Sequence, residues 1–209
     1  MQEPLDLLYK ILVVGDICVG KTSIIKKYTH NIFMENYKAT VGVDFALKVL
    51  GLEDSTKVKL QFWDIAGQER FNSLSRVYYK DAVAAFVVFD ITRELTYTDG
   101  ATKWKKDIDD KVRFPDTEEP LPVILLANKI DCGDNSELSE KIFDTIENFC
   151  RENNFITWYK TSAKTGEGIT EAINEMTQII LSKTNRKQVT HIPNGFKLNS
   201  VESKTSNCC

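Results

Sequence analysis

One eight-residue segment limits the possible folds of this chain more than any other feature. Residues 15–22 read Gly-Asp-Ile-Cys-Val-Gly-Lys-Thr and fit the pattern GxxxxGK(S/T). The pattern lies between an apolar run at 8–14, typical of a buried strand, and a helix-like stretch at 21–29 without Gly or Pro. Glycines let backbone N–H groups converge on a phosphate, and a helix start adds its positive end. The segment therefore predicts a phosphate-binding loop between a strand and a helix.

Strand-like and helix-like segments alternate along the rest of the chain. Apolar residues at spacings of three and four predict helices at 97–112, 137–151 and 168–181. This alternation predicts an α/β fold of the P-loop NTPase type: a doubly wound, mostly parallel sheet with one antiparallel edge strand and helices on both faces. Runs rich in Val, Ile and Phe predict the further strands, the first two joined as a hairpin, at 43–50, 57–63, 83–89, 123–127 and 155–159.

Four side chains near the expected strand ends suit a phosphate group and a metal ion. We expect Lys21 to reach the β- and γ-phosphates and the Thr22 hydroxyl to ligate Mg²⁺. Thr40, in the expected loop before residue 43, offers a second hydroxyl ligand. Asp64 ends a strand-like run and can hold the Mg²⁺ through water.

Gly67 and Gln68 follow Asp64 closely. The Gly67 N–H is placed to meet a γ-phosphate, and Gln68 to orient an attacking water. Phosphoryl transfer depends on such positioning more than on covalent chemistry. Gln68 is therefore the candidate catalytic residue.

Two segments after later strand-like runs indicate which base is bound. Residues 128–131 read Asn-Lys-Ile-Asp, and the carboxylate of Asp131 can accept from both the ring N–H and the exocyclic amine of guanine. Adenine lacks both donors at these positions, so it leaves a buried charge unpaired. Residues 161–164 read Thr-Ser-Ala-Lys, and we expect the Ala163 N–H to hold the guanine carbonyl oxygen. The predicted ligands are GTP and GDP with Mg²⁺.

With these motifs the chain resembles the Ras superfamily of small GTPases and, within it, the Rab family. The resemblance spans about residues 8–181 and the final cysteines, with all five nucleotide motifs at the family's spacing. Ile65, where most Rab proteins carry Thr, and the stretches 39–50, 76–80 and 113–122 resemble the branch associated with lysosome-related organelles, phagosomes and mitochondria. Rab-type signatures stand at 41–45, 59–64, 66–71 and 77–81.

The motifs and the resemblance together assign candidate roles to individual residues. Phe33 is expected to stack on the base, and an exposed aromatic trio, Phe45, Trp63 and Tyr78, to report the switch state to effectors. Candidate metal ligands are Thr22, Thr40 and Asp64. The candidate nucleotide-binding residues are Gly15, Cys18, Val19, Gly20, Lys21, Thr22, Ser23, Phe33, Thr40, Gly67, Asn128, Lys129, Asp131, Ser162, Ala163 and Lys164.

The last part of the chain has a different composition from residues 1–181, the expected GTPase domain. Residues 182–209 are polar, hold five basic residues against Glu202 alone, and predict a flexible tail. The tail ends in Cys208 and Cys209, which resemble the dual geranylgeranylation site of Rab proteins. Two lipid chains give stable anchoring where one gives marginal binding. The five cysteines are scattered and odd in number, which favours a reduced cytosolic protein.

The resemblance implies a membrane-anchored switch that hydrolyses GTP slowly and recruits effectors in vesicle and organelle trafficking. Expected partners are an exchange factor, a GTPase-activating protein, the Rab escort protein, the GDP-dissociation inhibitor and effectors. We expect a monomer on the cytoplasmic face of an organelle membrane with a cytosolic pool. The net charge of −3 with a basic tail argues against nucleic-acid binding.

The phosphate-binding loop also departs from its family. Small GTPases commonly have small residues at its third and fourth positions, where this chain has Ile17 and Cys18. Ile17 is expected to crowd Gln68, and Cys18 must adopt a backbone shape that glycine takes more easily. We therefore predict normal affinity with slow hydrolysis. Two alternatives stay open: a binding module that remains GTP-loaded, and a small kinase, which leaves 128–131 and 161–164 unexplained.

Overall fold

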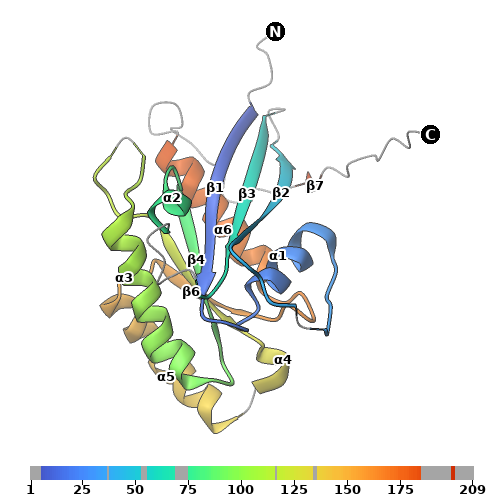
Figure 1. Cartoon of the computed structure of the whole chain (residues 1–209), viewed down its shortest axis with the longest axis vertical. Helices are drawn as coiled ribbons and strands as arrows, with labels where there is room; N and C mark the ends of the chain where they lie inside the picture. The colour runs from blue at the N-terminus through green and yellow to red at the C-terminus, as the bar shows by residue number, and fades with distance from the viewer. Residues whose placement is uncertain are drawn as a thin grey trace, which may run out of the picture.

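Seven strands of the described residues form one sheet at the centre of the molecule (Figure 1). The computed structural model describes residues 6–36, 38–52, 56–68, 75–115, 117–133, 136–184 and 199–200. The strand order is β6-β5-β4-β1-β3-β2-β7. The strands are β1 (Asp6–Gly15), β2 (Val43–Gly51), β3 (Lys57–Ile65), β4 (Ala84–Asp90), β5 (Val123–Asn128), β6 (Thr157–Thr161) and β7 (Asn199–Ser200).

The pairing confirms the predicted, mostly parallel sheet. Strands β6, β5, β4, β1 and β3 run parallel, and β2 pairs antiparallel with β3. The antiparallel strand was expected at the edge, but the two-residue β7 lies outside it and pairs with Leu50 and Gly51. No strand was expected in the tail.

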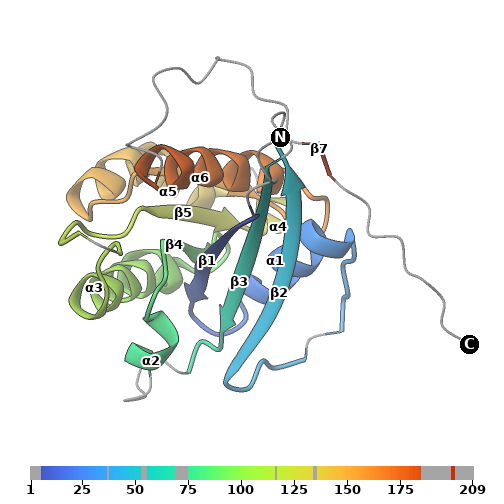
Figure 2. The ribbon, with the colours of Figure 1, turned by 90° about the horizontal axis from the view of Figure 1, so that it is seen from above.

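Helices cover both faces of the sheet. Figure 2 shows α6 on one side and α2 and α3 on the other, and α1 contacts α6. Tyr97 in η2 packs against Phe149 in α5 with ring centroids 4.5 Å apart. The helices are α1 (Lys21–His30), α2 (Ser75–Tyr79), η2 (Thr96–Ala101), α3 (Thr102–Lys111), α4 (Ile130–Gly133), α5 (Glu137–Glu152) and α6 (Ile169–Thr184).

Strands β4 and β5 lie at the centre of the hydrophobic core. Every residue of both strands is buried, as expected where helices cover both faces of a parallel sheet. Because β1, β3, β4, β5 and β6 are parallel, their carboxyl ends meet at one edge of the sheet. The predicted nucleotide motifs follow these ends, so the topology brings them together.

Several elements differ from the expected ones. The helix expected at 97–112 begins as the π-helix η2 before α3, and the short helices α2 and α4 were not predicted. Helix α6 continues to Thr184, three residues past the expected end of the domain. The three prolines and three acidic residues of segment 113–122 predict an exposed loop, but Phe114 and Leu121 are buried there. In the described ranges, no helix is long and apolar enough to cross a bilayer.

Candidate nucleotide-binding site

The predicted phosphate-binding loop connects β1 to α1. Helix α1 begins at Lys21, directly after Gly20, whose φ of 100° favours glycine. A Cβ atom on Gly20 would lie 2.3 Å from Nδ2 of Asn128, so the loop also needs glycine for space. Among the described residues no side chain caps this helix start, and its first turn has no acidic residue. Its N–H groups and its positive end are therefore open to an anion.

Lys21 lies in the centre of the loop with only 6% of its surface exposed. Its Nζ donates to the carbonyl oxygens of Gly15 at 2.8 Å and Asp16 at 2.9 Å. Burial lowers the pKa of Lys21 to about 8, and the nearby charge of Asp64 opposes this shift. A buried ammonium group held by loop carbonyls suits a phosphate ligand, because the anion stabilises its charged form.

Cys18 has a left-handed backbone. Its φ of 63° confirms the prediction that this position takes a conformation easier for glycine. Val19, which follows it, is buried, whereas Ile17 and Cys18 are exposed. The unusual loop residues therefore face outward and the apolar anchor faces the core.

Hydroxyl and carboxylate oxygens converge beside Lys21. Oγ1 of Thr22 lies 2.8 Å from Oγ1 of Thr40 and donates to Oδ2 of Asp64. The Asp64 side chain is buried, and its Oδ1 has no hydrogen-bond partner among the described residues. Burial raises the pKa of Asp64 above its usual range, and the hydrogen bond from Thr22 opposes this. This oxygen set, with an unpaired buried carboxylate oxygen, fits a hard divalent cation such as Mg²⁺.

Gly67 and Gln68 follow β3 at the same edge of the sheet. The backbone of Gly67 lies so close to Ile17 that an added Cβ would be 2.5 Å from the Ile17 nitrogen. Gln68 is exposed and is the last described residue before the gap at 69–74, so part of the 66–71 signature lies outside the described residues. Its role in orienting water stays a prediction.

The two base-recognition motifs meet the phosphate-binding loop through Asn128. This buried side chain donates from Nδ2 to the Val19 carbonyl at 2.7 Å. Its Oδ1 accepts from the Ala163 N–H at 3.2 Å. We expected that N–H to be available to the guanine carbonyl, but in this structure it donates to Asn128. The Asn128 side chain therefore links the phosphate-binding loop, the end of β5 and the segment after β6.

Asp131 is held by a hydrogen bond from Ser162, in the segment 161–164. Its Oδ1 accepts from Oγ of Ser162 at 2.6 Å. Burial alone would raise the pKa of Asp131, but the hydrogen bonds from Ser162 and Cys132 lower it below the usual range. The carboxylate is thus held in its ionised form, which is the form that accepts two hydrogen bonds from guanine.

The remaining candidates lie around these motifs. Lys129 has a φ of 70°, and its Nζ lies 2.8 Å from Oδ2 of Asp90. Ser23 lies half-buried in the first turn of α1, and Lys164 is exposed after β6. Phe33 lies 37% exposed in the loop after α1, and its stacking on the base stays a prediction.

Comparisons with known proteins agree with this geometry. A family model described as the Ras family matches residues 10–182. The chain is 51% identical over 182 residues to Ras-related protein Rab-32A of Dictyostelium discoideum, an alignment that covers 87% of this chain and 82% of that protein. The chain belongs to the Rab family of small GTPases. It is also 50% identical over 179 residues to human Ras-related protein Rab-32, covering 86% of this chain and 77% of that protein.

A relative from another named group aligns over almost the whole chain. Ras-related protein Rab-7L1 of Rattus norvegicus is 42% identical over 207 residues, covering 98% of both chains. As a Rab GTPase, the protein hydrolyses GTP to GDP and is a GTP-dependent switch in membrane trafficking. The predicted family is confirmed, the Rab-32 and Rab-7L1 relatives are consistent with the predicted branch, and the small-kinase alternative has no support.

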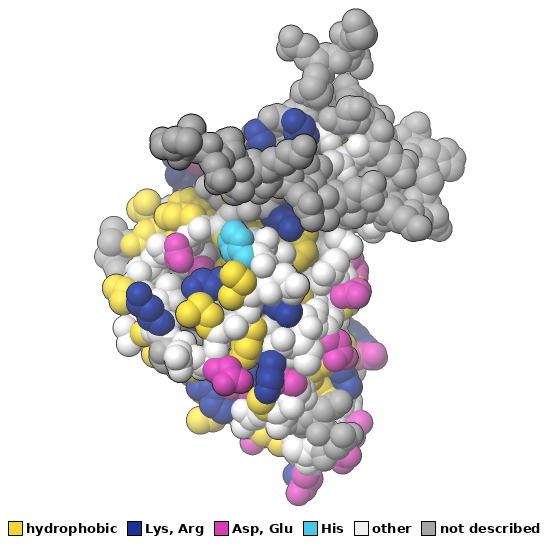
Figure 3. All heavy atoms as spheres, turned by 90° about the vertical axis from the view of Figure 1, so that its right-hand side faces the viewer, with side chains coloured by type: hydrophobic (Ala, Val, Ile, Leu, Met, Phe, Trp, Pro, Cys, Tyr) yellow, Lys and Arg dark blue, Asp and Glu magenta, His cyan; other side chains and the backbone are white. Residues whose placement is uncertain are grey.

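Two members of the Rab aromatic trio pack against each other. Phe45 and Trp63 pair across β2 and β3, with ring centroids 4.5 Å apart and nearly perpendicular rings. Phe45 is 54% exposed, whereas Tyr78 lies half-buried on α2. On the face seen in Figure 3, which carries α1 and the loop after it, hydrophobic side chains are interspersed with charged and polar ones. The trio's role toward effectors stays a prediction.

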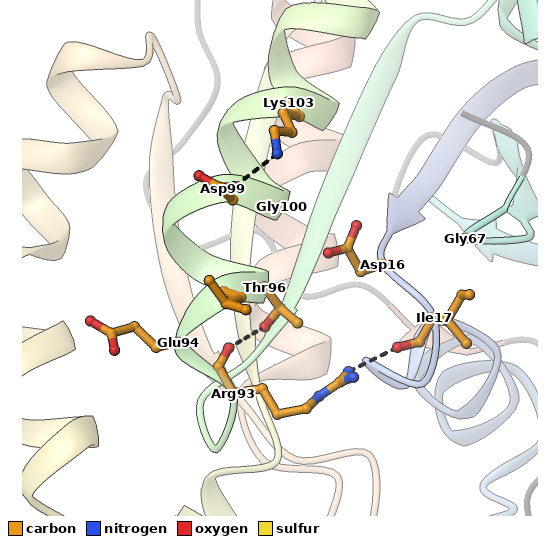
Figure 4. A pocket seen from close by; sticks show the side chains of 10 residues that line it. Asp16, Ile17, Gly67, Arg93, Glu94, Thr96, Asp99, Gly100 and Lys103 are labelled. Carbon is orange, nitrogen blue, oxygen red and sulfur yellow. Dashed lines mark hydrogen bonds and ion pairs between the residues drawn. The ribbon is translucent and has the colours of Figure 1, made fainter. Parts of the chain in front are cut away.

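Sequence reasoning missed several residues around the site. Nζ of Lys10 lies 3.3 Å from the centroid of the Trp63 ring, and Nε1 of Trp104 donates to Oδ1 of Asp16 at 2.9 Å. Arg93 reaches the phosphate-binding loop beside a cleft of about 650 Å³, which lies between that loop, Gly67 and η2 (Figure 4). No local pattern could have indicated these contacts, because each joins residues far apart in the chain.

Proposed function

We propose that this site holds GTP or GDP together with Mg²⁺. The observation that carries the proposal is the convergence of oxygens from Thr22, Thr40 and Asp64 beside the buried Lys21 at the start of α1. Lys21 and the loop N–H groups bind the phosphates, and Thr22 and Thr40 ligate the metal. Asp64 holds the metal through water. When bound, Mg²⁺ neutralises phosphate charge.

Base recognition is assigned to the motifs that follow β5 and β6. Asp131 accepts from the two guanine donors, and its hydrogen bond from Ser162 keeps it in place. Asn128 fixes the distance between this pocket and the phosphate-binding loop. Phe33 covers the base when the loop after α1 closes on it.

Hydrolysis is assigned to Gln68 and is slow without an activating protein. The backbone of Gly67 lies against the backbone of Ile17, and we expect the exposed Ile17 side chain to crowd Gln68 and an incoming group at the γ-phosphate. This contact also favours a second candidate, a binding module that stays GTP-loaded. A single-turnover hydrolysis measurement separates the two: the second candidate requires a rate that an activating protein does not raise.

Membrane attachment is assigned to Cys208 and Cys209, which lie outside the described residues. Lipid on both cysteines anchors the protein to the cytoplasmic face of a lysosome-related organelle, a phagosome or a mitochondrion. An exchange factor and an activating protein set its nucleotide state, and the escort protein and the dissociation inhibitor handle its lipidated form. Mass spectrometry of protein from eukaryotic cells tests the modification, and a Cys208→Ser, Cys209→Ser double variant is the matched control.

The switch itself is tested in cells with two opposed variants. Thr22→Asn weakens the metal site and favours the GDP form, whereas Gln68→Leu blocks hydrolysis and favours the GTP form. We expect the two variants to differ in location and in the proteins they bind. Identical locations and identical bound proteins would contradict the proposal.

A further inference from the structure

Asp90, at the end of β4, is a fully engaged anchor close to the nucleotide site. Its side chain is only 2% exposed. Oδ2 lies 2.8 Å from Nζ of Lys129 and 3.0 Å from Nε of Arg93. Oδ1 accepts from the N–H and the hydroxyl of Thr92 at 3.0 and 2.7 Å. A carboxylate with four donors has a fixed orientation, so Asp90 can hold Arg93 in place.

Arg93 connects Asp90 to the phosphate-binding loop. Its Nη2 donates to the backbone carbonyl of Ile17 at 2.8 Å, as Figure 4 shows. The Arg93 backbone is fixed as well, because its carbonyl accepts from the Thr96 hydroxyl at 2.7 Å. The Arg93 guanidinium therefore contacts Asp90 through Nε and the loop through Nη2. The fork geometry of arginine makes both contacts possible at once.

The carbonyl that Arg93 holds belongs to the peptide that enters the left-handed residue of the loop. No peptide bond in the described residues is cis, so the Ile17–Cys18 peptide points its C=O and N–H in opposite directions. With the carbonyl directed outward to Arg93, the Cys18 N–H is directed to the other side of the peptide. Cys18 has a φ of 63°, which a side chain with a Cβ adopts at a cost, so this peptide needs an external contact to hold it.

We infer that Arg93 is a positioning residue of the nucleotide site: it holds the Ile17–Cys18 peptide so that the Cys18 N–H faces the phosphates. Through Asp90 it also links this peptide to Lys129 in the base-recognition motif. The inference rests on the proposed function, because it assigns a ligand to that N–H. Arg93 acts through the loop, since its Nε and Nη2 are engaged on Asp90 and on the Ile17 carbonyl.

Three variants test this role. Arg93→Ala removes both contacts, and Arg93→Lys keeps the charge but not the fork that spans Asp90 and Ile17. Lys103→Ala is the matched control, because Lys103 lines the same cleft and pairs with Asp99 at 2.8 Å. This replacement removes one positive charge, as Arg93→Ala does, but leaves the contacts of the phosphate-binding loop unchanged. The readouts are the dissociation rate of fluorescent GDP with Mg²⁺, the thermal unfolding midpoint, and the ¹H–¹⁵N resonance of the Cys18 amide in EDTA-treated protein.

We expect Arg93→Ala to raise the GDP dissociation rate about tenfold and Arg93→Lys to raise it less. Lys103→Ala should stay within about twofold of the unmodified chain. The Cys18 amide resonance should shift in Arg93→Ala even without nucleotide. In a Cys18→Gly background the effect of removing Arg93 should shrink, because glycine takes the left-handed conformation without strain. If removing Arg93 raised the GDP dissociation rate only through a global loss of packing, the increase would be the same with cysteine or glycine at position 18.

The results separate two failures. If the unmodified chain retains no GDP, the proposed function fails and the inference falls with it. If the unmodified chain retains GDP and Arg93→Ala matches Lys103→Ala in dissociation rate and in the Cys18 resonance, the inference alone is overturned. A drop in unfolding midpoint with an unchanged dissociation rate would also overturn it, since Arg93 would then be purely structural.

Discussion

The backbone of Gly67 lies directly against the backbone of Ile17. A Cβ atom on Gly67 would be 2.5 Å from the Ile17 nitrogen and 3.0 Å from its Cα, closer than real side chains pack. The third residue of the phosphate-binding loop and the residue before Gln68 therefore share one small space. The Ile17 side chain is 43% exposed, so it extends from this contact toward solvent. We expect this side chain to crowd a group that approaches Gln68.

Replacing Ile17 with glycine should speed intrinsic GTP hydrolysis. The change removes a bulky side chain that lines the same cleft as Gly67 and that we expect to crowd Gln68, so we expect a gain of about tenfold, which corresponds to about 1.4 kcal/mol in the barrier. Single-turnover hydrolysis of Mg²⁺–GTP measures it. Ile156→Gly is the control, since Ile156 is also exposed but lies before β6. An unchanged rate in Ile17→Gly would count against the crowding account.

Replacing Trp104 with phenylalanine should destabilise the fold. Nε1 of Trp104 donates to the Asp16 carboxylate at 2.9 Å and thereby ties α3 to the phosphate-binding loop. Losing a hydrogen bond to a charged group costs about 2 kcal/mol. Urea unfolding measures the free energy of unfolding. In an Asp16→Ala background the same replacement should cost less than half as much; equal costs in both backgrounds would refute the coupling.

Replacing Asp90 with asparagine should lower stability in a pH-dependent way. Burial would raise the pKa of Asp90, but hydrogen bonds from Lys129 and Thr92 outweigh it and lower the pKa below its usual value. The contribution of ionised Asp90 to the free energy of unfolding is therefore fully present above its unfolded-state pKa of about 4. It is lost as the pH falls through the lower folded-state pKa. We expect about 2 kcal/mol near neutral pH, with the difference from the unmodified chain shrinking below about pH 4.

Denaturant unfolding over this pH range measures the effect of Asp90→Asn. Asp99→Asn serves as the control, because Asp99 is exposed and pairs with Lys103 at the surface. A difference that stays constant from neutral to acidic pH would mean that the ionised form of Asp90 is not stabilised in the folded protein.

The sheet and the motif positions could be predicted because their signals are local. Strands β4 and β5 are buried at every residue and show in the sequence as continuous apolar runs. The phosphate-binding loop can be recognised in the sequence because its strand, its glycines and its helix follow one another in a single segment. Strand β6 was predicted two residues early: Phe155 is buried, but it lies in the connection before the strand. A buried apolar residue in a connection cannot be told from a strand residue by its type alone.

The contacts that hold the site together could not be predicted. Arg93 binds a backbone carbonyl, and every residue has one, so the type of its partner gives no signal. Trp104 and Asp16 meet only because η2 brings Gly100 against Asp16, where an added Cβ would be 2.7 Å from Oδ2. The hydrogen bond from the Ala163 N–H to Oδ1 of Asn128 likewise depends on how β5 and β6 align.

The most direct test of the account is which base the site selects. Fluorescent GDP, bound with Mg²⁺, is displaced by unlabelled GDP, ADP or xanthosine diphosphate in the unmodified chain and in Asp131→Asn. In xanthosine diphosphate a carbonyl replaces the guanine amine, so an asparagine amide can pair with it where the Asp131 carboxylate cannot. We predict that the unmodified chain prefers GDP to ADP by about 10³-fold or more and that Asp131→Asn prefers xanthosine diphosphate to GDP. Equal competition by ADP, or an unchanged preference in Asp131→Asn, would contradict the account.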